Sequence, residues 1–149
     1  MRSQVSEIEI VAASEMNCVS VALFLKNQRL PIDDIDPGLQ GFFVARDENK
    51  IVGTVGIEDY GPVGLLRSLA VNESYRGAKL GKRLFDVALN HAESHGIQTL
   101  YLLTTTADSY FGKLGFRRIK REEAPEAIRR TDQFNRLCPA SAAIMRKQI

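Results

Sequence analysis

Between residues 65 and 104 the spacing of the apolar residues changes twice, and this change limits the fold more than any other feature of the sequence. Residues 65–71 form a compact apolar run that is typical of a buried strand. Apolar residues then recur at positions 80, 84, 87 and 88, the spacing of one helix face, and Gly96 is well placed to end that helix. Residues 99–104 are again β-branched and apolar. The order strand, long helix, strand predicts a crossover unit in an α/β or α+β protein.

Short strands and turns surround this unit. Residues 7–12 predict a first strand, and Ser14 offers an N-cap for an amphipathic helix. The apolar positions of this helix are Met16, Val19, Leu23 and Phe24. Two strands of a meander follow at 42–46 and 51–58, after a loop with two prolines and three aspartates at 30–41. Beyond residue 104 we expect a short helix at 107–114, a strand at 116–119, a helical region at 125–136 and a last strand at 142–145.

Length and composition indicate one globular domain. The chain has 149 residues, of which 44% are apolar and 26% charged; this is enough for one core and excludes intrinsic disorder. The net charge of +2 gives no general attraction to nucleic acid or membranes, so we expect neither as a partner. No run reaches the ~20 apolar residues of a membrane span, and residues 1–9 lack the apolar core of a signal peptide. We therefore expect a cytoplasmic protein with reduced thiols at Cys18 and Cys138.

The turn that enters the long helix is a candidate anion site. The first amide N–H groups of a helix have no partner within the helix, and together with the helix dipole they can bind phosphate. Gly77 and Gly81 allow a close approach to the backbone. Four basic residues stand close together here: Arg76, Lys79, Lys82 and Arg83. The same pattern is also typical of an ordinary solvated helix start, so the local pattern leaves both interpretations open.

In its wider context the sequence resembles the GNAT superfamily of acetyl-CoA-dependent N-acetyltransferases. The resemblance rests on LRSLAV at 66–71, RGAKLG at 76–81 and KLGF at 113–116, in the order and spacing of that family. It implies a single domain over residues 1–149, with a mixed, mostly antiparallel sheet of six to seven strands, helices on both faces and splayed central strands. It also implies acetyl-CoA as the acetyl donor and, as a family tendency, a homodimer. The residues themselves predict no metal site, because His91 and His95 have helical zinc-site spacing but lack a third ligand.

The resemblance also implies how the cofactor is held. The turn before the long helix would cradle the pyrophosphate of coenzyme A, and the splayed strand would pair with the pantetheine arm. A main-chain N–H near Leu69 or Ala70 would polarise the thioester carbonyl. Lys79 stands where the family usually has glycine, so its conformation must suit a side chain. The implied cofactor-binding residues are Leu69, Ala70, Val71, Arg76, Gly77, Ala78, Lys79, Leu80, Gly81, Lys82, Thr104 and Phe111.

Direct attack of an amine on the thioester needs a base for the amine and a proton for the departing thiolate. Glu58 is the candidate base, because family members often place a carboxylate at the end of this strand; an exposed charge that opens a turn explains Glu58 equally well, and Asp59 is a weaker substitute. The family often has a tyrosine acid at the position of Phe111. We therefore assign the acid to the adjacent Tyr110, with Ser109, a water or unaided departure of the thiolate as alternatives.

The expected acceptor is a small amino acid or an amino-acid analogue. The segments at 56–58, 102–106 and 137–142 look like those of small acetyltransferases associated with arsenic-resistance operons, and 102–106 is also similar to the acetyltransferase domain of N-acetylglutamate synthase. The planar donor fork of Arg67 suits an acceptor carboxylate, unless it pairs with a structural acid. A thiol at 138 could contact an arsenical or lie in the core. The candidate acceptor-binding residues are Arg67, Ser68, Thr105 and Cys138.

Two other functions stay open at this point. One is an N-acetyltransferase for a protein or a polyamine, which an open, acidic acceptor groove would favour. The other is a non-catalytic acyl-CoA-binding domain, which the absence of tyrosine at position 111 keeps in view. The helical region at 125–136 could form a lid over the acceptor or simply pack on the sheet.

Overall fold

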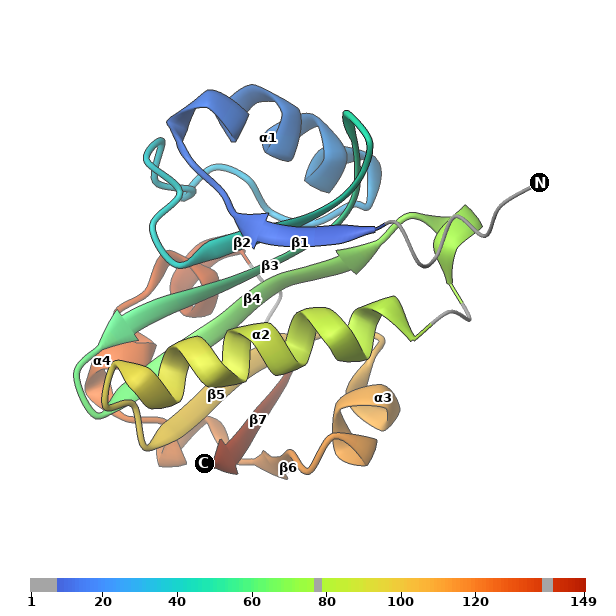
Figure 1. Cartoon of the computed structure of the whole chain (residues 1–149). Coiled ribbons are helices and arrows are strands. Elements are labelled where there is room, and N and C mark those ends of the chain that lie inside the picture. Colours follow the sequence, from blue (N-terminus) through green and yellow to red (C-terminus); the bar gives the residue numbers. More distant parts are fainter. Residues whose placement is uncertain (1–7, 77–78, 138–140) are drawn as a thin grey trace.

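A seven-stranded mixed sheet forms the centre of the molecule (Figure 1). The computed structural model describes residues 8–76, 79–137 and 141–149. The strands are β1 (Glu9–Ala12), β2 (Phe42–Asp47), β3 (Lys50–Tyr60), β4 (Val63–Val71), β5 (Thr99–Thr104), β6 (Arg117–Ile119) and β7 (Ala143–Gln148). Their order in the sheet is β1-β2-β3-β4-β5-β7-β6, and all neighbours are antiparallel except β4 and β5. The mixed, mostly antiparallel sheet is confirmed.

Helices cover both faces of this sheet. The α-helices are α1 (Cys18–Asn27), α2 (Leu80–Ser94), α3 (Asp108–Lys113) and α4 (Glu126–Arg129). On one face, α2 and α3 pack on a core that includes Leu66 of β4. The adjacent Leu65 points to the opposite face, where it packs with Ile128 of α4. On that face α1 also packs, through Val21 and Leu25. The alternation of side chains along β4 therefore serves two separate cores.

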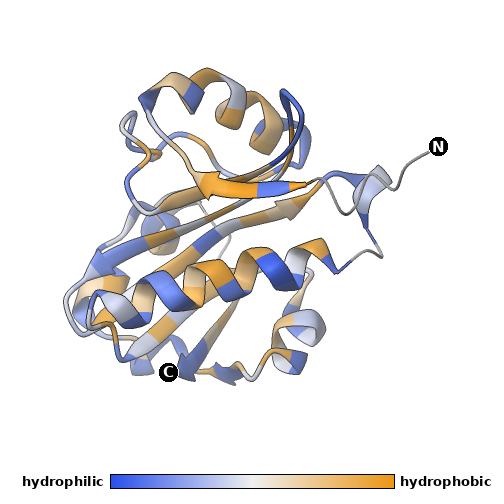
Figure 2. Ribbon diagram, in the orientation of Figure 1, coloured by the Kyte–Doolittle hydropathy of each residue, from blue (hydrophilic) through white to orange (hydrophobic). Residues whose placement is uncertain are grey.

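The spacing of apolar residues in α2 determines how it lies on the sheet. Leu80, Leu84, Ala88 and Ala92 are all buried, whereas the side facing away from the sheet is polar, as the mixed colouring of this helix in Figure 2 shows. Gly96 follows the helix with φ of +80°, a left-handed conformation that favours glycine. The predicted helix and its stop are both confirmed.

Of the four apolar positions predicted to face the core from the first helix, Phe24 packs there and the other three are exposed. Met16, Val19 and Leu23 are 89%, 72% and 59% exposed, and the buried residues of α1 are Val21 and Leu25. The segment at 16–25 is apolar nearly all round, so its spacing alone does not identify the buried side. The choice is made by Leu39 and Phe42, which come from later in the chain and cover Val21 and Leu25.

The helical region expected at 125–136 is two short pieces instead of one helix. α4 ends at Arg129, and a π-helical turn runs from Gln133 to Leu137. Between them the buried Thr131 donates its hydroxyl to the carbonyl of Ile128 at 2.7 Å and accepts the N–H of Phe134 at 3.2 Å. These bonds replace helical ones, which explains the interruption. Across the described residues, no helix is both long and apolar enough to cross a bilayer.

Candidate functional site

The two central strands separate along most of their length. β4 and β5 pair only where Val63–Leu65 lie beside Thr99–Tyr101. Further along, β5 pairs with β7 up to Thr104, and β4 keeps its pairing with β3. A cavity of about 1340 Å³, the main cavity, opens between the strands and is lined by both of them. The predicted splay is therefore confirmed, and it leaves one edge of β4 facing an open cavity.

A bulge in β4 lies in the middle of this edge. The register of β3 and β4 shifts between Thr54 and Gly56, and Ser68 has a left-handed backbone with φ of +59°. Such a conformation costs a non-glycine residue roughly 1 to 3 kcal/mol, so surrounding contacts must hold it. One of them is the fully buried Thr54, whose hydroxyl donates to the Ser68 carbonyl at 2.7 Å. Ser68, Leu69 and Ala70, the residues at and after the bulge, all line the cavity.

The N-terminus of α2 closes one end of the main cavity. Lys79 is the N-cap and has φ of +62° and ψ of 22°. The lysine thus adopts the left-handed conformation that glycine favours, rather than one that suits a side chain. Two residues further on, Gly81 lies close to Tyr110, because a Cβ added at Gly81 would lie 2.8 Å from the Tyr110 hydroxyl. Arg76, Lys79 and Lys82 line this end of the cavity, which therefore combines free helix amides with positive charge.

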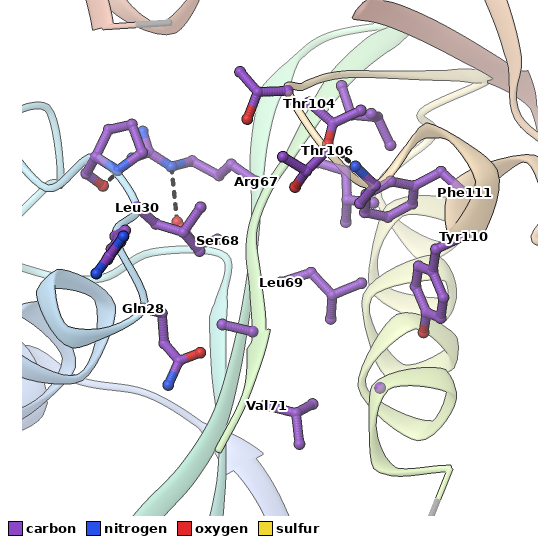
Figure 3. Close-up of a pocket in the computed structure, with 18 of the residues that line it drawn as sticks. Gln28, Leu30, Arg67, Ser68, Leu69, Val71, Thr104, Thr106, Tyr110 and Phe111 are labelled. Carbon is purple, nitrogen blue, oxygen red and sulfur yellow. Dashed lines mark hydrogen bonds between the residues drawn. The ribbon is translucent and has the colours of Figure 1, made fainter. Parts of the chain in front are cut away.

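Most of the cofactor-binding residues expected from the sequence line the main cavity. These are Leu69, Ala70, Val71, Arg76, Lys79, Leu80, Gly81, Lys82, Thr104 and Phe111. Of the expected acceptor-binding residues, Arg67, Ser68 and Thr105 also line it, as does Tyr110. Gly77, Ala78 and Cys138 lie outside the described residues. In Figure 3, Leu69 and Val71 of β4 point across the cavity toward Phe111 and Tyr110 of α3.

One wall of the main cavity was not expected from the sequence. It is formed by residues 28–33, from the loop of residues 28–41 between α1 and β2. Gln28 accepts a hydrogen bond from the Arg76 guanidinium at 3.2 Å, which ties this wall to the entrance of α2. The prolines and aspartates of the segment predicted a loop but gave no sign of the contact with Arg76.

Tyr110 lies on the cavity side of α3 but points toward the start of α2, away from Thr106 and Ser68 (Figure 3). Burial is the main cause that raises the pKa of its hydroxyl, and the charge of Asp86 adds to it while Lys82 opposes it. The phenol is therefore protonated at neutral pH, where it can donate one hydrogen bond and can also accept. Phe111 is buried and packs edge to face on Phe116.

Arg67 is buried, with only 4% of its surface exposed, and other residues of the protein accept its hydrogen bonds. Its side chain leaves β4 toward the segment that carries Leu30 (Figure 3). Asp34 accepts hydrogen bonds from both terminal nitrogens of Arg67, at 2.5 and 2.7 Å, in a bidentate pair. Glu58 accepts a hydrogen bond from Nη1 at 2.7 Å. The remaining bonds go to the Pro31 carbonyl at 3.3 Å and the Ser68 hydroxyl at 3.2 Å. All five N–H donors thus have acceptors, as in the alternative where Arg67 pairs with structural acids.

Burial alone would lower the pKa of Arg67, but the hydrogen bonds that it donates to Asp34 and Glu58, together with the negative charge of these two carboxylates, outweigh burial and raise it. The guanidinium is therefore charged at every accessible pH. Breaking such a buried pair by removing one partner typically costs about 3 to 5 kcal/mol. Arg67 consequently joins the 28–41 loop to β4 and to the end of β3.

Glu58 lines a second, smaller cavity of about 380 Å³ and not the main one. Its Oε2 accepts from Arg67, and its Oε1 accepts the Tyr60 hydroxyl at 2.5 Å. Burial first, and then the Glu58 carboxylate, raise the pKa of Tyr60 well above its ordinary value. Asp59 is exposed at the following turn, where it accepts the Gly61 N–H at 2.9 Å. Arg67 and its partners separate the two cavities, because Arg67 lines the main one while Asp34 and Glu58 line the smaller one.

Among the described residues, no group of three or more His, Cys, Asp or Glu side chains is arranged to hold a metal ion. Cys18, in α1, carries a free thiol outside the lining of the two cavities.

Comparison with known proteins assigns this arrangement to a family. The profile of the acetyltransferase (GNAT) family matches residues 10–116, and the chain belongs to that family. An uncharacterised N-acetyltransferase of Chlorobaculum tepidum is 28% identical over 98 residues, which are 65% of this chain and 63% of that protein. The amino-acid acetyltransferase of Pseudomonas fluorescens is 31% identical over 91 residues, 60% of this chain but 21% of the relative.

The fold is also that of solved structures. N-acetylglutamate synthase of Neisseria gonorrhoeae, complexed with coenzyme A and L-arginine, superimposes with a TM-score of 0.80 at 20% identity, covering 95% of this chain and 33% of that one. The chain thus spans only part of these relatives, less than two thirds of each. The likeness at this level of identity establishes a shared fold.

Proposed function

We propose that this protein is an N-acetyltransferase that moves an acetyl group from acetyl-CoA to the amine of a small acceptor. The observation that carries the proposal is the main cavity, in which an unpaired strand edge leads to a basic helix N-terminus. Pantetheine has amides that can pair with the edge of β4, and a pyrophosphate suits the amides at the start of α2. Membership of the acetyltransferase family supports the same donor.

In this proposal the amine attacks the thioester directly. The bulge at Ser68 presents main-chain N–H groups of residues 68–70 to the carbonyl, where negative charge develops in the transition state. Glu58 accepts the proton of the amine through a water, since it lies behind Arg67 at the edge of the smaller cavity. Direct attack needs no enzyme nucleophile, and the described lining of the main cavity contains no cysteine.

The protonation of the leaving thiolate is less constrained. Tyr110 was the candidate acid, but its hydroxyl lies beside the first turn of α2. That position favours a hydrogen bond to the cofactor near its pyrophosphate. We therefore propose that Tyr110 binds the donor and that water returns the proton, since a thiolate with an ordinary pKa near ~8.5 is a good leaving group.

For the acceptor, two classes are proposed. Similarity to amino-acid acetyltransferase and N-acetylglutamate synthase supports an amino acid or a close analogue. Arsenical analogues are included only because segments 56–58, 102–106 and 137–142 resemble acetyltransferases associated with arsenic resistance. The state of Arg67 supports a second class, the cationic amines such as polyamines or protein lysines. Its donors are occupied, and the smaller cavity beside it is lined by Asp34, Asp36 and Glu58. An amine that carries a second positive charge would suit these carboxylates.

The test measures acetyl-CoA turnover with a panel of amines, and the free thiol of the released coenzyme A is the signal. The panel contains amino acids, their amides, arsenical and phosphinic analogues, and polyamines. Turnover with at least one class is expected; tight binding of acetyl-CoA without turnover of any amine would instead indicate a non-catalytic binding domain. A preference for amino acids over their amides would select the first acceptor class, and the reverse preference the second.

The placement of the donor has its own test. Gly81→Glu puts a carboxylate in the first turn of α2, where the helix dipole stabilises it but where it would repel a pyrophosphate. We expect KM for acetyl-CoA to rise at least tenfold more than in Gly81→Gln, the uncharged control of the same size. Equal KM values in the two variants would contradict a pyrophosphate at this turn.

A further inference from the structure

The ion cluster around Arg67 contains one carboxylate that the proposed reaction does not use. Asp34 comes from the 28–41 loop, 33 positions before Arg67, and its side chain is 8% exposed. It occupies both terminal nitrogens of the guanidinium, in the fork-to-fork geometry that makes arginine pairs strong. Burying an acid of this kind is costly unless the charge is matched, so its presence needs a reason.

The geometry fixes the orientation of Glu58. Arg67 holds Oε2 and Tyr60 holds Oε1, so both carboxylate oxygens have a donor and rotation is restricted. The position of Arg67 is fixed in turn, because its Nη2 donates a hydrogen bond to Asp34. The orientation of Glu58 therefore depends on a residue that it does not touch.

The charges matter as much as the orientation. Glu58 and Asp34 both accept from Nη1 of Arg67, so their oxygens are at most about 5 Å apart. With one guanidinium between two carboxylates, the cluster has a net negative charge. A carboxylate in a simple one-to-one pair with arginine is a weak base; a second carboxylate on the same guanidinium weakens that effect.

We infer that Asp34 is a positioning residue that acts through Arg67 to keep Glu58 oriented and basic. The inference rests on the proposed function, since it gives Glu58 the role of base. It also assigns to Arg67 the role of a bridge between two acids in place of an anchor for the acceptor carboxylate. The groups that face Glu58 are Arg67 of β4, Asp34 of the 28–41 loop, Tyr60 of β3 and, around the smaller cavity, Asp36, Arg130 and Asp132.

The central experiment compares Asp34→Asn with wild type in the pH dependence of kcat/KM for the amine. Asparagine keeps the shape of the side chain and removes its charge, so Arg67 pairs with Glu58 alone and stabilises its ionised form. The acidic limb of the profile is then expected one to two pH units lower, with kcat above the limb reduced about three- to tenfold because the base is weaker. Asp34→Glu restores the charge and should recover most of the wild-type profile.

Glu9→Gln is the control. It removes one carboxylate charge from an exposed ion pair with Arg46, at a position that lines neither cavity. Its profile should match that of wild type. An acidic limb that does not move in Asp34→Asn, that moves to higher pH, or that moves equally in the control would overturn the inference.

A readout without catalysis separates this inference from the proposed function. The carboxyl carbon of Glu58, followed by NMR during a pH titration, should titrate at lower pH in Asp34→Asn than in wild type. If Asp34→Asn does not fold, the wild-type titration decides: a Glu58 curve with two steps, one tracking Asp34, supports the coupling, and a single independent step overturns it. Absence of amine acetylation by wild type, or a full rate in Glu58→Gln, would refute the proposed base while the titration still decides the coupling.

Discussion

The bulge in β4 leads to a prediction that can be worked out in magnitude. Thr54→Val replaces a fully buried hydroxyl by a methyl group of nearly the same size, and so deletes the hydrogen bond to the Ser68 carbonyl without changing the packing volume. A carbonyl deprived of its donor in a partly buried position costs about 1 to 2 kcal/mol. For a chain of this length that loss lowers the melting temperature by about 2 to 8 °C.

The same substitution should affect catalysis. The Thr54 bond helps to offset the strain of the left-handed Ser68, and without it the bulge can relax toward a regular strand. The main-chain N–H groups of residues 68–70 would then lose their aim at the thioester carbonyl. Removal of one such donor elsewhere costs about 10² to 10³ in rate, so a partial loss should reduce kcat at least about tenfold, with little change in KM for acetyl-CoA.

The assay combines thermal denaturation with steady-state kinetics, and Thr99→Val is the matched control. Thr99 lies on β5, and its hydroxyl makes no hydrogen bond with the described residues, so the same chemical change there should shift stability by less than about 0.5 kcal/mol. Wild-type stability in Thr54→Val would show that the bond does not hold the bulge. A normal kcat combined with the expected loss of stability would show that the bulge is not needed for catalysis.

Substitutions at three further positions test other parts of the molecule. Lys79→Gly should be about 1 kcal/mol more stable than Lys79→Ala in denaturant unfolding, because glycine adopts the left-handed conformation of this N-cap without steric cost. Both variants should raise KM for acetyl-CoA several-fold, because both lack the ammonium group. Tyr110→Phe should raise the same KM with kcat within about threefold of wild type; a hundredfold fall in kcat at unchanged KM would restore Tyr110 as the acid. Burial, with the charge of His95, lowers the pKa of His91, so the neutral ring is favoured in the folded state and stability is lost as pH falls below about 6.5. His91→Gln should flatten that loss between pH 7.5 and 5.5 in denaturation midpoints.

The regular elements of the fold were predictable from local patterns. β5 has the predicted bounds, and α2 follows its apolar spacing to the predicted glycine stop. Both elements owe their structure to short-range periodicity, which a single sequence displays directly. The buried face of α1 was not predictable, because the residues that cover it come from the loop and strand that follow.

The limits at the site have a similar origin. The basic turn before α2 could be predicted as a candidate anion site because its glycines and basic residues are close together in sequence. The partners of Arg67 could not, because Asp34 is brought to it by a loop whose path is set by tertiary packing. The direction of Tyr110 likewise depends on how α3 sits against α2, and a step of one residue on a short helix changes it.

The brief parallel contact of β4 with β5 has a mechanical consequence. Strands β1–β4 are joined to strands β5–β7 by strand pairing at only three register positions, all at one end of β4 and β5. The two halves are also joined by the core under α2, which contains Leu66 of β4 together with Leu100 and Leu102 of β5. A ligand bound in the main cavity would contact both β4 and β5. Amide hydrogen exchange along Leu66–Val71 and Leu102–Thr104 should therefore slow together when the ligand binds.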